Sequence, residues 1–253
     1  MKTAYFHYEF DYAHRLDIGK VRPGNEDRVF TNPEIGFFGV SDGIGGAKYG
    51  EKTAEMVSSS VPKAVETFLN ENGSNISPQK AEEGLIEAIE KVSDVVYELD
   101  NKIGAREYGA TISCTLLVDR FAVFGNVGDS RGYLMRNGAL YLLTEDDNYA
   151  NIMVKSGEMT EEQVKRHPFL STALTKYIGM KPARPHTAVV GLEKGDKILL
   201  CSDGLHGMLS DEEITDIMWL PMFADDTAEL LKDAANAAGG QDNISVIIIE
   251  ITM

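Results

Sequence analysis

Residues 109–143 have the sequence GATISCTLLVDRFAVFGNVGDSRGYLMRNGALYLL, in which three apolar runs are separated by short turns. Runs of this length, rich in Val, Ile, Phe, Leu and Tyr and bounded by Gly, Asp or Asn, are typical of β-strands. The third run contains Asn137-Gly138, a pair that favours the two-residue turn of a β-hairpin. Because strands joined by such short turns lie antiparallel, this stretch predicts part of an antiparallel sheet.

Similar runs on both sides of this stretch predict further strands. They are EIGFFGVSD (34–42), HTAVVGL (186–192), DKILLCSD (196–203) and NISVIIIEIT (243–252), with a short strand at the end of VRPGNEDRVF (21–30). Between about residues 145 and 185 the pattern changes to short polar helices, one of them capped by Thr160 and Gln163. We interpret this segment as an excursion over the sheet.

Two long amphipathic helices are predicted between the strands. The first covers about residues 51–69, contains Pro62 as a kink, and has the apolar face Ala54, Val57, Val61 and Val65. The second begins after Ser77 as N-cap with Pro78 in its first position, and has the apolar face Leu85, Ile89, Val92, Val96 and Leu99.

Two more helices are predicted near the end of the chain. One starts at Ser210 with Glu213 as a capping box, and the other covers about residues 227–238. Since strands follow strands and the long helices come in succession, the order predicts an α+β fold of antiparallel sheets with helices packed outside.

The composition is that of an ordinary globular protein. The chain has 253 residues, 43% hydrophobic and 25% charged, and a formal net charge of -16, which disfavours binding to nucleic acid or an anionic membrane. Cys114 and Cys201 lie in apolar runs and are expected to be buried and reduced. We find neither a signal peptide nor a run of about 20 apolar residues, and we expect a cytoplasmic protein.

A carboxylate beside glycine recurs where the predicted strands end. It occurs as SDGIGG (Asp42), NVGDS (Asp129) and CSDG (Asp203), and in mirror form as GGQDN (Asp242), with Glu26-Asp27 as a further acidic pair. One such residue is equally well explained as a turn residue. Four of them would repel one another unless a cation neutralised them, and all-oxygen ligands indicate a hard ion such as magnesium, manganese or calcium.

These motifs, in this order, resemble the type 2C (PPM) metal-dependent protein phosphatases. The resemblance rests on RPGNED, SDGIGG, GATISCTLLVD, GNVGDSRGYL, LLCSDGL and GGQDNISVIII, and it extends from about Leu16 to Thr252. It implies a single phosphatase domain over residues 1–253, folded as a four-layer α-β-β-α sandwich. It also implies that the excursion at about 145–185 is the family's flap.

The resemblance also implies a binuclear Mn²⁺ or Mg²⁺ site. Asp42 would bridge two tightly bound ions, Glu26 and the carbonyl of Gly43 would hold one, and Asp203 and Asp242 the other. Asp129, together with Asp203, would bind a third, weaker ion. Arg22 would contact the phosphate, and Asp27 would orient the attacking water.

The function implied is metal-dependent hydrolysis of phosphoserine and phosphothreonine in proteins. The length resembles the bacterial short form, which implies a monomer that reverses the action of a Ser/Thr kinase on its targets. Two other interpretations stay open: a pseudophosphatase that only binds phosphoproteins, and a phosphatase for small phosphate esters. Retention of Glu26, Asp42, Asp203 and Asp242 disfavours the first.

Several positions depart from the family pattern. Ile44 stands where many eukaryotic members have a histidine proposed as general acid. Asp147 and Asn148 replace a histidine and a serine that bacterial relatives often show. After His167-Pro168, the frequent arginine and asparagine are replaced by Phe169, Leu170 and Ser171. The other histidines, His7, His14, His186 and His206, are given no role, and His206 is placed at the surface or behind the ligands.

Overall fold

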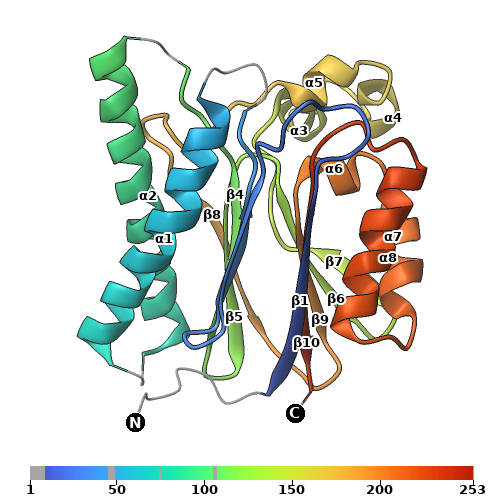
Figure 1. The fold of residues 1–253 in the computed structure, drawn as a ribbon, viewed down its shortest axis with the longest axis horizontal. Coiled ribbons are helices and arrows are strands. Elements are labelled where there is room, and N and C mark those ends of the chain that lie inside the picture. Colours follow the sequence, from blue (N-terminus) through green and yellow to red (C-terminus); the bar gives the residue numbers. More distant parts are fainter. Residues whose placement is uncertain (1–8, 45–48, 74–75, 105–106, 253) are drawn as a thin grey trace.

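The computed structural model describes residues 9–44, 49–73, 76–104 and 107–252. His7, and Gly45 and Gly46 of the loop after Asp42, lie outside these ranges. Within them, the strands form two five-stranded antiparallel sheets that face each other (Figure 1).

The first sheet has the strand order β1–β10–β9–β6–β7. Its strands are β1 (Phe10–Asp17), β10 (Ile244–Ile251), β9 (Lys197–Cys201), β6 (Arg131–Arg136) and β7 (Ala139–Leu142). The second sheet has the order β2–β3–β4–β5–β8. Its strands are β2 (Arg28–Asn32), β3 (Phe37–Ser41), β4 (Ile112–Val118), β5 (Phe121–Val127) and β8 (His186–Gly191).

The hairpin predicted at Asn137-Gly138 is confirmed. Both residues have positive φ angles, 51° and 80°, and the pair Arg136–Ala139 closes the ladder between β6 and β7. Two successive left-handed residues match the right-handed twist of the strands, and Asn and Gly are the residues that adopt this conformation at least cost.

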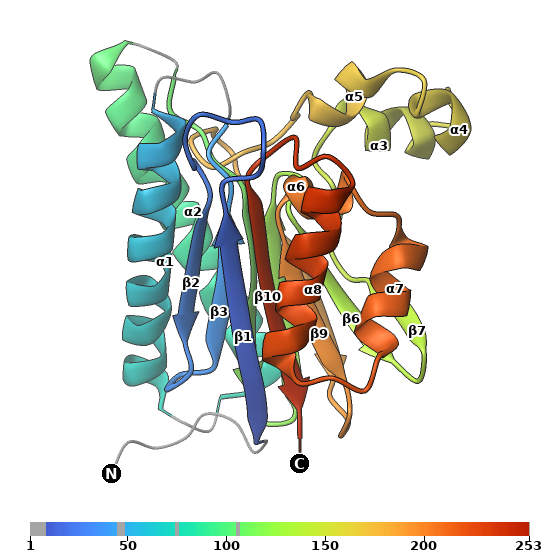
Figure 2. The ribbon, with the colours of Figure 1, turned by 45° about the vertical axis from the view of Figure 1, so that its right-hand side comes forward.

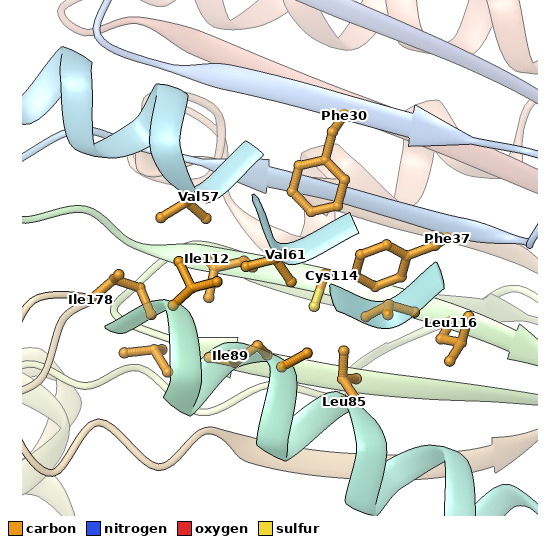
Figure 3. Close-up of a cluster of buried hydrophobic side chains, with 14 of the residues drawn as sticks. Phe30, Phe37, Val57, Val61, Leu85, Ile89, Ile112, Cys114, Leu116 and Ile178 are labelled. Carbon is orange, nitrogen blue, oxygen red and sulfur yellow. The ribbon is translucent and has the colours of Figure 1, made fainter. Parts of the chain in front are cut away.

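Helices α1 (Gly50–Asn72) and α2 (Pro78–Ile103) cover the outer face of the second sheet. The predicted apolar faces lie against it, and Figure 3 shows Val57 and Val61 of α1 and Leu85 and Ile89 of α2 packed with strand residues. The predicted cap of α2 is confirmed, because Ser77 accepts a hydrogen bond from the Lys80 backbone N–H at 3.2 Å.

Helices α6 (Asp203–His206), α7 (Asp211–Trp219) and α8 (Ala224–Ala237) cover the outer face of the first sheet (Figure 2). Both halves of the capping box between Ser210 and Glu213 are present. The prediction for α8 was wrong at its start: Ala224 is fully buried and helical, and the Thr227 hydroxyl donates back to the Phe223 carbonyl inside the first turn.

A third apolar cluster fills the space between the two sheets and completes a four-layer α-β-β-α sandwich. Its residues come from both inner faces and include Phe38, Phe124, Leu200, Ile247 and Ile249. Residues 145–185 contain the short helices α3 (Tyr149–Lys155), α4 (Glu161–Val164) and α5 (Pro168–Thr172), and the capping box of Thr160 and Gln163 is present. They stand beyond one end of the sheets, on the side of α6 (Figure 2).

Two elements were missed by the sequence prediction. Strand β1 pairs only with β10 at a sheet edge, so its pattern is interrupted by exposed polar residues such as Asp11 and His14. Helix α6 is a single turn that follows β9 directly. Among the described residues, no helix is long and apolar enough to cross a membrane.

Candidate functional site

A pocket of about 250 Å³ lies at the end of the sheets from which α6 projects. Five acidic side chains and one cationic side chain from distant parts of the sequence line it: Arg22, Glu26, Asp42, Asp129, Asp203 and Asp242. Gly43 and Ile44 also line it, and Thr172 and Leu174 reach it from the excursion that contains α5. The structure therefore brings the predicted site residues together, except Asp27, which lies behind the pocket lining.

Two hydrogen bonds with Thr111 hold the backbone of Asp42, one through its N–H and one through its carbonyl. Its N–H donates to the Thr111 hydroxyl at 3.0 Å, and its carbonyl accepts from the Thr111 N–H at 2.8 Å. The Gly43 N–H donates to the Glu26 carbonyl at 3.2 Å, which joins the two acidic loops. A Cβ on Gly43 would lie 2.5 Å from the carbonyl carbon of Gly50, so only glycine lets α1 start this close.

Asp203 was predicted at the end of a strand, but it is the first residue of α6, since β9 ends at Cys201. A Cβ on Gly204 would collide with the Asn243 carbonyl oxygen, so the backbones of α6 and of the loop before β10 are in direct contact. This contact brings Asp203 and Asp242 to the same side of the pocket.

Asn243 fixes the loop that carries Arg22, Glu26 and Asp27. Its amide group donates to the carbonyls of Ile18 and Gly24, both at 2.9 Å, and its oxygen accepts from the Glu26 N–H at 2.8 Å. All of these partners are more than 200 residues away in the sequence. Sequence reasoning missed this role; the signal was its position directly after Asp242.

Asp27 is buried, and one of its oxygens is fully engaged. Oδ2 accepts from the hydroxyls of Ser202 at 2.7 Å and Ser245 at 2.6 Å, whereas Oδ1 has no hydrogen-bond partner. Burial raises the pKa of Asp27 to about 7, and the charge of Asp203 adds to the rise while the two hydroxyls oppose it. Asp27 therefore has one oxygen held and one available as an acceptor.

Burial and mutual repulsion raise the pKa values of the other site carboxyls. The pKa of Asp203 is raised to about 6, first by burial and then by the charge of Asp242. Those of Asp42 and Asp129 are raised well above 3.8, again by burial first and then by neighbouring aspartates. Burial also raises the pKa of Glu26, and the positive charge of the nearby Arg22 opposes this rise. The single positive charge of Arg22 does not balance the five acidic side chains of the pocket.

Arg22 is the cationic side chain of the pocket, and its Nη2 lies 2.6 Å from Oδ2 of Asp242. Its side chain is 43% exposed, so its planar guanidinium can also face a ligand in the pocket. A guanidinium matches two oxygens of a phosphate or carboxylate. The pair with Asp242 therefore keeps Arg22 beside the acidic cluster.

The donor set fits a hard divalent cation that keeps water ligands. The oxygens are carboxylates and the Gly43 carbonyl, and the described atoms that are buried without a partner include Oδ1 of Asp27 and Oδ1 of Asp203. Across the described ranges, no three acidic, His or Cys side chains form a closed metal cage. Asp242 is engaged by Arg22, so the carboxylates surround the pocket without closing on one point.

His206 was placed at the surface or behind the ligands, and the structure shows the second arrangement. Its Nε2 lies 2.9 Å from the backbone carbonyl of Asp129, in a half-buried position. Burial lowers its pKa to about 4, so the ring is neutral at physiological pH. It holds the Asp129 turn and brings no charge to the site.

The comparisons with known proteins agree with this geometry. The family model described as protein phosphatase 2C matches residues 25–241. A "putative protein phosphatase 2C-type" of Streptococcus pyogenes is 32% identical over 93% of this chain and 95% of its own length. The "serine/threonine phosphatase stp" of Listeria monocytogenes is 31% identical over 96% and 95%.

Solved structures are similar over nearly the whole chain. The serine/threonine phosphatase Stp1 of Staphylococcus aureus has a TM-score of 0.88 at 26% identity and covers 99% of this chain and 98% of its own. The catalytic domain of the serine/threonine phosphatase PstP, solved with two manganese ions, has a TM-score of 0.79 at 26% identity, with 96% and 99% covered.

Proposed function

This chain belongs to the protein phosphatase 2C family and is a metal-dependent serine/threonine protein phosphatase, and we propose that Glu26, Asp42, Asp203 and Asp242 hold two cations in its pocket. The observation that carries the proposal is the meeting of five acidic side chains from distant segments around one pocket, beside a single arginine. Buried like charges without cations are costly, and divalent ions relieve that cost.

In the proposed arrangement, Asp42 would be a ligand of both of two Mn²⁺ or Mg²⁺ ions. Glu26 and the Gly43 carbonyl would hold one ion, Asp203 and Asp242 would hold the other, and Asp129 with Asp203 would provide a weaker third position. The ions, when bound, supply a water of lowered pKa and neutralise charge on the phosphate. Support for this division comes from the backbone: the Gly43 N–H donates to the Glu26 carbonyl, and Gly204 and Asn243, which directly follow Asp203 and Asp242, are in close backbone contact.

The chain's own side chains would bind the phosphate and align the attack. Arg22 presents its guanidinium at the pocket and binds two equatorial phosphate oxygens. Asp27, with Oδ2 held by Ser202 and Ser245, has Oδ1 left to accept a hydrogen bond from the attacking water. Direct attack by water requires no phosphorylated side chain.

The substrates of the enzyme are phosphoproteins. Its oligomeric state and the kinase that it opposes are part of our proposal. It acts as a monomer, since one chain supplies every proposed site residue, and it opposes a Ser/Thr kinase by acting on that kinase or its targets. The net charge of -16 favours basic segments around the phosphorylated residue.

The function is tested with a phosphothreonine peptide and p-nitrophenyl phosphate. We expect hydrolysis of both with manganese, and loss of it after EDTA with recovery on adding manganese back. Phosphopeptide binding without any turnover would instead indicate a pseudophosphatase. Turnover of the small ester alone would indicate a small-molecule phosphatase.

Manganese should raise the melting temperature more at pH 8 than at pH 5. Carboxyls with raised pKa values bind protons in the folded state between their ordinary pKa of 3.8 and about 7, so their contribution to stability falls as pH rises through that window. Manganese replaces those protons, and its effect should be on the order of 5–10 °C at pH 8 when present at about 100 times its Kd.

The measurement is the difference in melting temperature between manganese and EDTA at pH 5, 6, 7 and 8. His206, whose pKa is lowered to about 4, contributes in the opposite direction, but equally with and without metal, so it cancels in the difference. An equal rise at every pH would show that the ion does not bind to these carboxyls.

A further inference from the structure

Several contacts join the excursion with α3–α5 to the sandwich, among them the ion pair of Arg131 with Asp146 and the buried carboxylate of Asp147, which is 7% exposed. Its Oδ2 accepts from the Gly128 N–H at 3.0 Å. Its Oδ1 lies 2.8 Å from Nζ of Lys176 and 2.9 Å from Nε2 of His186. Three segments therefore meet at this group: the turn between β5 and β6, the end of the excursion and the start of β8.

Backbone hydrogen bonds connect the same segments. The Asp147 N–H donates to the Gly128 carbonyl at 2.9 Å, and the Thr175 N–H donates to the Asp147 carbonyl at 2.7 Å. Farther out, the Tyr149 N–H donates to the Ala173 carbonyl at 3.1 Å. The two ends of the excursion are thus held together and held to the β5–β6 turn.

These segments lead to two residues of the pocket lining. Gly128 directly precedes Asp129, and Leu174 lies two residues before Lys176; both Asp129 and Leu174 line the pocket. Gly128 has a φ of 99°, and a Cβ there would lie 2.6 Å from the Thr111 side chain, so the turn has little freedom to adjust by itself. Asp147 therefore contacts both of the segments that lead to Asp129 and to Leu174.

We propose, on the basis of the phosphatase function above, that Asp147 is a positioning residue. It sets the distance between the excursion residues that line the pocket, Thr172 and Leu174, and the turn that carries Asp129. Through Lys176 it holds Thr172 and Leu174 where the polypeptide around a phosphorylated residue enters. Through Gly128 it holds Asp129. A protein substrate contacts Thr172 and Leu174 as well as the proposed ligands, whereas a small aryl phosphate depends on Asp147 only through the weaker third ion position at Asp129.

The kinetic test compares Asp147→Asn and Lys176→Met with the control Asp196→Asn. Asp196 is also buried, at 1% exposure, pairs with Arg136 at 2.6 Å and accepts a backbone N–H, but it lies at the opposite end of β9 from Asp203. We expect the KM for a phosphothreonine peptide to rise about 10-fold in Asp147→Asn and in Lys176→Met, which we call the clamp variants, because each loses a charge-assisted hydrogen bond. The kcat for p-nitrophenyl phosphate should change less than about 3-fold, and the control should change neither.

A second measurement is independent of activity. Backbone amide exchange at Gly128 and Thr175 should be faster in both clamp variants than in the wild type, with exchange in β4 and β10 unchanged. Lys176→Met leaves the Asp147 carboxylate intact, so this variant still tests the positioning role of Asp147 if Asp147→Asn does not fold. Unchanged exchange, or an unchanged peptide KM in an active enzyme, would overturn the proposal. A wild type inactive on every ester would refute the phosphatase function, and the exchange comparison would still decide whether Asp147 holds these segments.

Discussion

Asp42→Asn should lower kcat at least about 10³-fold at saturating manganese, because Asp42 would be a ligand of both proposed ions. Asp203→Asn should have an effect of the same order. Both changes keep the size and shape of the side chain and remove one ligand charge. The measurement is turnover of p-nitrophenyl phosphate over a manganese titration, so that weaker binding is separated from slower chemistry.

The metal-free variants should be at least as stable as the metal-free wild type. The Asp42 carboxylate is surrounded by Asp27, Asp203 and Asp129, and its replacement by a neutral amide removes repulsion that the fold otherwise carries. Melting temperatures in EDTA should therefore not fall, whereas the rise on adding manganese should disappear. Near wild-type turnover in either variant would contradict the ligand assignment.

The second large effect concerns Ile44, whose side chain lines the pocket and lies against Gly109. A serine or threonine alkoxide needs a proton as the P–O bond breaks, and p-nitrophenolate does not. Isoleucine cannot donate one, and carboxyls that hold cations stay ionised. A positioned general acid is worth about 10²–10⁴-fold where the leaving group needs it. We therefore expect kcat/KM to fall steeply as the leaving-group pKa rises across a series of aryl phosphates.

The matched variants are Ile44→His and Ile44→Leu. The histidine variant should flatten the slope and accelerate alkyl phosphates more than p-nitrophenyl phosphate, while the leucine variant should keep the wild-type slope. Both are measured at the same pH and manganese concentration. A shallow slope in the wild type would show that another group already supplies the proton.

Much of the fold was predicted correctly because the deciding signals are local. The Asn137-Gly138 turn, the Ser77 cap and the Ser210 capping box each depend on residues within four positions of one another. Asp42 and Asp242 were found because glycine and an apolar strand flank them. Strand β1 lacks such a signal, since it is a sheet edge with polar residues on its exposed face.

The contacts that build the site were not predictable, because they join distant segments. Asp27 and its donor Ser202 are 175 residues apart, and Ser245 is 218 residues from Asp27. The hydrogen bonds around Asp147 depend on where the excursion begins and ends. That aspartate replaces the family's frequent histidine at this position did not indicate that Asp147 would contact Lys176. Composition and periodicity contain no information about such pairs.

Asp27 precedes β2 of one sheet, whereas its donors Ser202 and Ser245 follow β9 and lie in β10 of the other, so buried hydrogen bonds connect the two sheet layers at the site. The proposed ligands are divided in the same way: Glu26 and Asp42 flank β2 and β3 of one sheet, and Asp203 and Asp242 flank β9 and β10 of the other. Ions held by both pairs would link the two layers, and the layers would then separate only after the ions had dissociated. The supply of manganese would then govern the lifetime of each folded molecule against proteolysis as well as its rate of work.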